Sequence, residues 1–425
     1  MQEDFLHYIW NHKKFNFSQL KTTNNKLVTI RNIGTSNKNT GPDFFNAQLK
    51  IGEQLWAGNV EIHVKSSDWY LHNHETDSNY DNVILHVVWE HDTDVFRKDN
   101  SKIPTLELKK YVSNDTINNY SKLFFKSQKW INCENDYSSV DKFTISHWLE
   151  RLYFERLEKK SELIKELLED SKNDWEAILF CMLAKNFGLK INGDAFLSIA
   201  KSVKFSIIRK TNGNQINLEA LFFGQAGLLE NDVQDTYHMQ LKKEYNFLRQ
   251  KVNLSNKHIV PVQFFRLRPS NFPTIRLSQL ASLYSKTHNL FSKIIELQSI
   301  DDFYHLFSTE TSPYWESHYT FGKESKASKK RVSKSFINLI LINTVIPIKF
   351  WYAQYLGKPI DQEITDLVTQ IPSEKNRIVE KFLKLKSISS SALESQALIQ
   401  LKNEYCDKNR CLQCAIGNEI LTGIH

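Results

Sequence analysis

The sequence predicts a two-part protein: an N-terminal α/β domain built on a mixed β-sheet, followed by a larger, mainly helical domain. Short runs rich in β-branched and aromatic residues are concentrated before residue 92, whereas amphipathic helical patterns fill the chain from residue 141 onward. The 425 residues also exceed the usual size of one hydrophobic core. We therefore place the α/β domain at residues 1–115, a linker at 116–140 and the helical domain at 141–425.

The N-terminal domain is expected to open with a helix over residues 2–12, where apolar side chains recur at helical spacing. The run from 83 to 89 is apolar except for His86, which is typical of a central strand covered on both faces. The connection at 69–82 is a loop or a short helix. Clusters of Gly, Asn and Asp separate the four expected strands, at 27–33, 44–51, 56–65 and 83–91.

The C-terminal two thirds show the alternation of apolar and charged residues that is typical of amphipathic helices. The longest such stretch is FTISHWLERLYFERLEKKSELIKELLEDSK, which begins at residue 143. Short stretches with Gly, Pro or Asn separate the later segments. Further helices are expected at about 174–187, 217–230, 235–251, 276–297, 335–356 and 391–404.

Composition limits the possible functions. The net charge is +7, with 55 basic and 48 acidic residues, so the surface carries both signs of charge. This charge is compatible with nucleic-acid binding but does not by itself indicate it. No run approaches 18 uninterrupted apolar residues, and the N-terminus is acidic where a secretory signal would be basic. We expect a soluble cytoplasmic protein without a membrane partner. The oligomeric state does not follow from the sequence.

A row of ionisable residues lies on the third expected strand. Because side chains alternate along a strand, Glu61, His63 and Lys65 share one face while Val60, Ile62 and Val64 share the other. If the preceding strand pairs with this one, Asp43 lies near Glu61, and two neighbouring carboxylates favour a divalent cation. Such a cation lowers the pKa of bound water and neutralises phosphoryl charge. The alternative is a turn at Pro-Asp and a solvated edge strand.

The stretch Gly41-Pro42-Asp43 and the following Glu61-Ile62-His63 resemble the PD-(D/E)XK nuclease superfamily, whose core runs helix, three strands, helix, strand. This resemblance implies that Asp43 and Glu61 bind Mg²⁺ or Mn²⁺, with Glu3 as an additional acid. It also implies a lysine two positions after the glutamate, where this chain has His63, followed by Lys65. The implied function is metal-dependent hydrolysis of phosphodiester bonds in DNA or RNA. The alternative is an inactive nucleic-acid-binding or scaffold protein.

Three further histidines lie near this motif. The pair His72 and His74 can hold zinc or iron together with another ligand, or can simply line a loop. His86 interrupts a buried strand and is read first as a hydrogen-bonded core histidine. A third functional hypothesis therefore remains open: a metal enzyme that uses His63, His72 and His74 on a small molecule.

Three cysteines, Cys406, Cys411 and Cys414, follow the spacing C-x4-C-x2-C. Thiolates grouped in this way select Zn²⁺ or an iron–sulfur cluster. Cys133 is the expected fourth ligand, and His425 is an alternative. One distant and three C-terminal cysteines also resemble the cluster that clasps the nuclease domain in some members of the same superfamily. The remaining Cys181 lies in an apolar helix and is expected in the core.

Basic residues gather in two segments of the helical domain. One is GKESKASKKRVSK (322–334), which contains Lys329, Lys330 and Arg331, and the other contains Arg266 and Arg268 beside two prolines. Both are candidate contacts to nucleic-acid phosphates. The alternatives are a solvated loop for the first segment and helix caps for the second.

Over its whole length the chain resembles an uncharacterised bacterial family known only as a domain of unknown function. The stretches that carry this resemblance are GPDFFNAQ, GNVEIHVKSSDW, VILHVV, FFGQAGLL, RPSNFPTIR and RCLQCAIG. The resemblance implies no biochemical activity.

Overall fold

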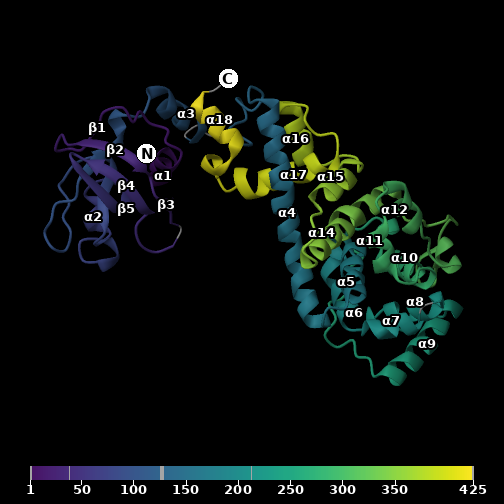
Figure 1. Ribbon diagram of the computed structural model, residues 1–425. Helices are drawn as coiled ribbons and strands as arrows, with labels where there is room; N and C mark the ends of the chain where they lie inside the picture. Colours follow the sequence, from purple (N-terminus) through teal and green to yellow (C-terminus); the bar gives the residue numbers. More distant parts are fainter. Residues whose placement is uncertain (1, 38, 125–128, 212, 424–425) are drawn as a thin grey trace. The chain divides into compact units, whose positions relative to one another are not determined.

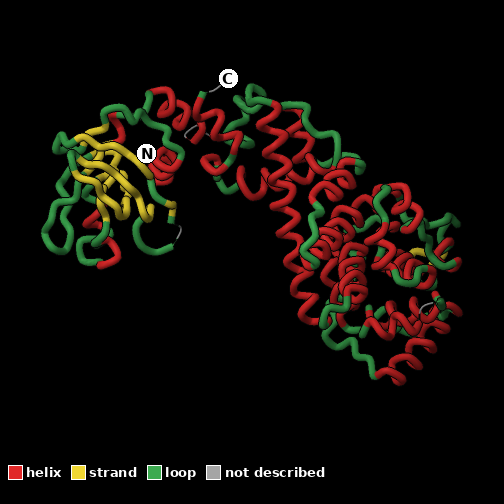
Figure 2. Tube along the Cα trace, viewed as in Figure 1, coloured by secondary structure: helices red, strands yellow, loops and turns green. Residues whose placement is uncertain are grey.

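The computed structural model describes residues 2–37, 39–124, 129–211 and 213–423, and the chain divides into two compact units. Unit 1 comprises Met1–Trp148, Lys381–Ser387 and Gln400–His425. Unit 2 comprises Leu149–Glu380 and Ile388–Ile399. Strands are concentrated in unit 1 and helices in unit 2 (Figure 2). This confirms the predicted order of a mixed sheet followed by a mainly helical region, but the division differs from the expected boundaries because the cysteine segment belongs to unit 1.

Unit 1 is built on one mixed sheet (Figure 1). Its strand order is β1-β2-β4-β5-β6-β7, and β3 pairs with β4. The pairs β2–β4 and β4–β5 are antiparallel, and β5–β6 and β6–β7 are parallel. The strands are β1 (Leu20–Lys21), β2 (Leu27–Asn32), β3 (Thr35–Ser36), β4 (Phe44–Ile51), β5 (Gln54–Lys65), β6 (Val83–Glu90) and β7 (Thr105–Glu107).

Two helices pack in unit 1 around Phe5. Helix α1 (Glu3–Asn11) contacts β5 and buries its apolar face, as its helical periodicity predicts. Phe5 on α1 stacks on Tyr120 of α3 (Asn114–Phe124), with ring centroids 4.0 Å apart. The expected linker at 116–140 therefore begins as a helix of unit 1.

Because β5 and β6 are parallel, a tight turn cannot join them and the chain needs a longer crossover connection. Helix α2 (Asp68–Leu71) and the 3₁₀ turn η1 (Ser78–Tyr80) provide it. Trp69 and Tyr80 anchor this crossover in a buried cluster with Val83, Val95 and Ile103. The connection predicted as a loop or short helix thus contains both, and it carries His72 and His74 between its two buried aromatic anchors.

Unit 2 is helical apart from a two-stranded hairpin, β8 (His318–Thr320) and β9 (Lys323–Glu324). Helix α4 (Lys142–Ser171) begins in unit 1 and continues into unit 2. The other described helices of unit 2 are α5 (Trp175–Phe187), α6 (Leu189–Lys201), α7 (Phe205–Thr211), α8 (Gln215–Gln225), α9 (Thr236–Val252), α10 (Pro273–Lys286), α11 (Leu290–Glu296), α12 (Ile300–Leu306), α13 (Lys334–Ile340), α14 (Ile346–Tyr355), α15 (Asp361–Thr369), α16 (Arg377–Leu385) and α17 (Ala392–Gln400), of which α16 and α17 extend past the unit boundary.

Helices α8, α9 and α10 form a close-packed part of unit 2. Residues 273–284 of α10 are buried continuously. Gly224 lets α8 approach α9, because a Cβ at this position would lie 2.1 Å from the ring of Tyr245. This close approach explains why the stretch FFGQAGLL has a glycine at position 224.

One helical stretch of the described chain, Lys334–Tyr355, is long and apolar enough to cross a membrane. It consists of α13, a π-helical turn (Leu341–Val345) and α14. Of its most apolar window, 72% is buried inside the protein, as in the core helix of a soluble protein.

Candidate functional site

Asp43 and Glu61 lie together at the junction of β4 and β5. The backbone N–H of Asp43 donates to Glu61 Oε2 at 3.1 Å, and the N–H of Ile62 donates to Asp43 Oδ2 at 2.9 Å. Pairing of Phe44 with Val60 in the antiparallel register sets this proximity. Glu61 is only 4% exposed, so the structure places the two predicted acids in one partly buried site.

His63 lies at the centre of a histidine cluster on the same face. Its Nδ1 lies 2.9 Å from His86 Nε2, and its Nε2 lies 3.1 Å from His72 Nδ1. The parallel register of β5 and β6 pairs Glu61 with His86, so the neighbouring strand brings His86 beside His63. His63 and His86 are both buried. His86 therefore forms a hydrogen bond with Nδ1 of His63, while Nε2 of His63 faces His72.

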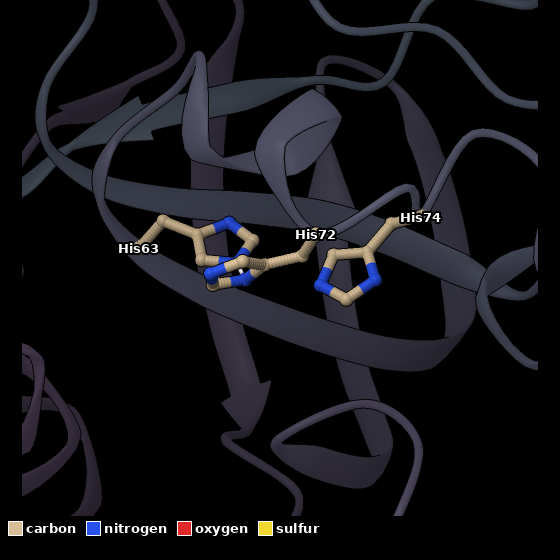
Figure 3. Close-up of side chains that lie close together, drawn as sticks. All are labelled: His63, His72 and His74. Carbon is tan, nitrogen blue, oxygen red and sulfur yellow. Dashed lines mark hydrogen bonds between the residues drawn. The ribbon is translucent and has the colours of Figure 1, made fainter.

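His74 completes the cluster from the crossover. Figure 3 shows its ring directed toward those of His63 and His72, and ligand atoms of the three lie within 4.8 Å of one another. His74 Nε2 lies 3.3 Å from Glu61 Oε1, and His63 Nε2 lies 3.5 Å from the same oxygen. The ring of His74 stacks on Tyr80 at 3.7 Å. No described residue forms a hydrogen bond with the buried His74 Nε2.

Helix α1 adds a residue that the sequence analysis did not single out. His7 Nε2 lies 3.3 Å from Asp43 Oδ2 and 3.8 Å from Glu3 Oε1. Burial alone would lower the pKa of His7, but its pairing with Asp43 outweighs this and the net shift is upward. Glu3, predicted as an additional acid, thus reaches the site beside His7. Their i, i+4 spacing on one helical face was the available signal.

Burial sets the charge states in the cluster. Burial and the charge of Asp43 raise the pKa of Glu61 well above its ordinary value. Burial, together with His74 and His72, lowers the pKa of His63 to about 3, and burial lowers the pKa of His86 well below its usual range. These two imidazoles are therefore neutral near pH 7, which is the form that binds metal.

The spacing of these groups fits a metal ion. Ligand atoms that bind one cation at 2.0–2.1 Å in tetrahedral directions lie roughly 3.3 Å apart. His63 Nε2 lies 3.1 Å from His72 Nδ1 and 3.5 Å from Glu61 Oε1, which itself lies 3.3 Å from His74 Nε2. Imidazole nitrogens suit zinc or iron and carboxylate oxygens suit manganese, whereas magnesium prefers oxygen ligands alone. The donor set therefore fits a transition metal better than Mg²⁺.

Lys65 does not join this cluster. It lies at the exposed end of β5, and its backbone N–H donates to Asp68 Oδ2 at 2.9 Å. His63, and not Lys65, occupies the centre of the polar face beside Glu61.

Cys133, Cys406, Cys411 and Cys414 line one cavity of about 20 Å³ in unit 1. Burial raises the pKa of each thiol, and the mutual charge of the sulfurs contributes to the shift for Cys133, Cys406 and Cys414. The structure thus brings Cys133 to the three C-terminal cysteines, as the spacing argument expected. His425, the other predicted ligand, lies outside the described residues.

Local structure fixes the cysteine segment. A π-helical turn (Leu401–Cys406) and a 3₁₀ turn, η7 (Cys411–Gln413), precede α18 (Ala415–Thr422). Gly417 is required here because a Cβ would lie 2.2 Å from the carbonyl oxygen of Cys411. The turn η7 also contacts α1. The cysteine segment therefore packs on the helix that carries His7.

The structure changes the interpretation of the basic segments in unit 2. Lys330 is buried, and its ammonium donates to the carbonyl oxygens of Trp315 and Glu316. It therefore has an internal role and is not available to a phosphate, contrary to the expectation. Lys329 is exposed, and Arg331 is exposed but paired with Glu310 at 2.9 Å.

The arginines beside the two prolines also include both exposed and buried side chains. Arg266 and Arg268 are exposed, as a phosphate contact requires. Arg276 is buried and donates to Gln279 and Asn271, at 2.9 and 2.6 Å. Only the first two remain candidate contacts.

Comparison with known proteins identifies a family but no activity. A family model described as a protein of unknown function (DUF2851) matches residues 3–377. No curated protein and no solved structure matches the chain.

Proposed function

The chain belongs to the DUF2851 family, whose description carries no activity, and we propose from the geometry of unit 1 that it is a metal-dependent hydrolase of phosphodiester bonds in nucleic acid. The observation that carries this proposal is the grouping of ligand atoms of His63, His72 and His74 within 4.8 Å of one another, with Glu61 Oε1 lying 3.3 Å from His74 and 3.5 Å from His63, next to Asp43. The proposed metal is Mn²⁺ or Zn²⁺ rather than Mg²⁺.

Each residue has a distinct role in this proposal. Glu61 and the three histidines bind the cation, and His86 orients His63 through its Nδ1. A cation at this position lowers the pKa of a bound water and neutralises charge on a phosphoryl oxygen. Asp43 and His7 lie at the edge of the site, where their 3.3 Å pairing can hold a proton. His63 thus stands at the position where the PD-(D/E)XK pattern has its lysine, and in this proposal it binds the metal instead.

Nucleic acid is the proposed substrate class for two reasons. The order α1, three main strands, crossover helix and β6 agrees with the nuclease-like core that the motif implied. Exposed cations in unit 2, among them Arg266, Arg268 and Lys329, suit phosphate contacts.

The four cysteines are proposed to hold a second, structural metal centre. Thiolates around one zinc ion lie about 3.8 Å apart. Among the described residues, the histidine group is the one with three ligand atoms within 4.8 Å of one another, so no three of the thiols are that close. This wider spacing favours an iron–sulfur cluster over a single Zn²⁺. Such a centre would fasten the C-terminal segment to α1.

Cleavage by purified full-length protein tests the hydrolase proposal. The protein is stripped with a chelator and supplied with Mn²⁺, Zn²⁺ or Mg²⁺ in separate reactions containing single- or double-stranded DNA or RNA. We expect cleavage that requires the added metal and is lost in Asp43→Ala and Glu61→Ala. Cleavage that survives both substitutions would refute the proposal. Salt-sensitive binding without cleavage in any metal favours the inactive binding protein instead.

A second candidate is a metal enzyme that acts on a small molecule through the three histidines. The close approach of three imidazoles favours it, because such a set also occurs in non-nuclease metal enzymes. Turnover of small phosphate or carboxylate esters with stoichiometric metal, but without nucleic-acid cleavage, would select this candidate.

A further inference from the structure

A long part of unit 2 carries positive charge without any acid. Between Glu244 and Glu296 the chain has no aspartate or glutamate, although it has 48 acidic residues in total. Apart from the buried Arg276, every lysine and arginine in this stretch is exposed. These exposed cations are Arg249, Lys251, Lys257, Arg266, Arg268, Lys286 and Lys293.

Within this stretch, residues 253–268 leave α9 as a loop that reaches η3 (Pro269–Asn271) and then α10 (Figure 2). Two anchors on α6 fix its backbone. The side chain of Asn192 accepts from Gln263 N at 2.7 Å and donates to Gln263 O at 2.8 Å. Ser198 Oγ accepts from Val260 N at 3.0 Å. Hydrogen bonds to helical side chains thus hold the loop in one path.

The loop presents one aromatic ring to solvent. Phe264 packs against Phe272, with ring centroids 5.2 Å apart. The next residue, Phe265, is 75% exposed, and the guanidinium of Arg266 lies 5.1 Å from its ring centroid. Arg266 has a left-handed backbone, with φ of 62°.

We propose that residues 257–268 bind single-stranded nucleic acid, with a base stacked on Phe265 and phosphates at Arg266 and Arg268. An exposed aromatic ring beside arginines in an acid-free segment is the combination that binds unpaired strands. A duplex offers no free base face to this ring, so the preference is for single strands. The inference rests on the proposed nucleic-acid substrate and deepens it by naming the single-stranded form.

Binding measured in chelator, without catalysis, tests the inference. The full-length protein is titrated into fluorescently labelled single-stranded oligothymidylate, oligouridylate and a DNA duplex of equal length, and anisotropy is recorded. We expect Phe265→Ala to weaken binding to both single strands by about fivefold or more and to leave duplex binding unchanged. Arg266→Ala and Arg268→Ala should each reduce the salt slope by about 1.

Phe143→Ala is the matched control, because Phe143 is 78% exposed but lies outside the acid-free stretch. Equal single-strand affinities of the Phe265→Ala and Phe143→Ala proteins would overturn the inference. So would a duplex preference in the unsubstituted protein, or Phe265-dependent binding to anionic phospholipid vesicles or self-association in place of strand binding. Strand binding through Phe265 without any cleavage keeps the inference and rejects the hydrolase, so the two failures are distinguishable.

Discussion

The carboxylates of Asp43 and Glu61 each accept a hydrogen bond from the backbone of the strand that carries the other residue. Glu61 accepts from the N–H of Asp43 itself, and Asp43 accepts from the N–H of Ile62, next to Glu61. These two hydrogen bonds fix the orientation of both carboxylates within the site. Pre-ordered ligands lose little conformational freedom on binding.

The charge of Glu61 should control metal affinity. Glu61→Gln keeps an oxygen that can accept from Asp43 but, unlike the glutamate, cannot release a proton and become a carboxylate when a cation binds, so we expect Mn²⁺ or Zn²⁺ affinity to fall by about 100-fold. Isothermal titration calorimetry measures this. Glu53→Gln, at a 99% exposed side chain in the turn between β4 and β5, is the control. Equal affinity in the two variants would remove Glu61 from the ligand set.

Removal of either crossover histidine, His72 or His74, should leave the site without bound metal. His72→Ala and His74→Ala are expected to purify with less than about a tenth of the metal bound to the unsubstituted protein, measured by elemental analysis after separation from excess metal. His86→Ala should have a smaller effect, about 10- to 100-fold in affinity, because His86 acts through His63. His12→Ala, an exposed histidine after α1, serves as the control. Full metal content in all the variants contradicts the site.

The cysteine centre should stabilise unit 1. Replacing Cys133, Cys406, Cys411 or Cys414 with serine is expected to abolish iron content and visible absorption and to lower the Tm of unit 1 by at least about 5 °C. Because η7 contacts α1, metal affinity at Glu61 should also weaken. Cys181→Ala in unit 2 is the control. Stoichiometric zinc without iron or sulfide in the unsubstituted protein would replace the proposed cluster with a single ion.

Glu219 should make the stability of unit 2 depend on pH. This buried carboxylate on α8 accepts from Tyr237, Ser278, Ser312, Trp315 and Gln215. Burial dominates and raises its pKa in the folded state. The folded protein therefore binds this proton more tightly than the unfolded chain, and its contribution to stability is lost as pH rises above about 4.3.

Urea unfolding at several pH values measures this dependence. Glu219→Gln should remove the slope, whereas Glu219→Ala should lower the free energy of unfolding by about 3 kcal/mol because it leaves buried donors without a partner. Glu296→Gln, at an exposed glutamate of the same unit, should change neither quantity. An unchanged slope in the Glu219→Gln protein would exclude Glu219 as its source.

Two adjacent lysines should separate binding from folding. Lys330→Ala removes a buried ammonium that holds two carbonyl oxygens and lies 4.2 Å from the Tyr319 ring centroid, so we expect a loss of about 2 kcal/mol in unfolding free energy. Lys329→Ala should leave stability unchanged and weaken strand binding, with a salt slope lower by about 1. Thermal unfolding and anisotropy distinguish the two. Reversed effects would contradict the structural assignment.

Strand periodicity explains why the sequence could predict the centre of the site. Alternation along β5 was enough to group Glu61 with His63, and one antiparallel turn brought Asp43 beside them. The i, i+4 spacing places His7 on the same helical face as Glu3, but the contact of His7 with Asp43 depends on where α1 packs on the sheet, which local pattern does not determine. Cys133 was predicted beside Cys406, Cys411 and Cys414 from the need for a fourth soft ligand and from the resemblance to nucleases with one distant and three C-terminal cysteines, with His425 as the alternative.

Other features depend on long-range contacts. The stretch GLKINGD (188–194) contains glycine and asparagine, which are typical of a break between helices, yet it lies mostly within α6. There the side chain of Asn192 satisfies the backbone of Gln263 far along the chain, and a Cβ at position 193 would lie 3.2 Å from the carbonyl oxygen of Lys185. Lys330 was predicted as a phosphate contact, with a solvated loop as the alternative, because no local pattern revealed the carbonyl oxygens to which its ammonium donates.

The discontinuity of unit 1 has a consequence for biosynthesis. Its sheet is translated first, but Cys406, Cys411 and Cys414 leave the ribosome only after all of unit 2. During translation the nascent sheet must therefore remain soluble with α1 uncovered on the side that η7 later contacts. A premature stop codon after residue 399 would therefore leave all of unit 2 intact but remove from unit 1 the segment Gln400–His425, which carries three of the four cysteines.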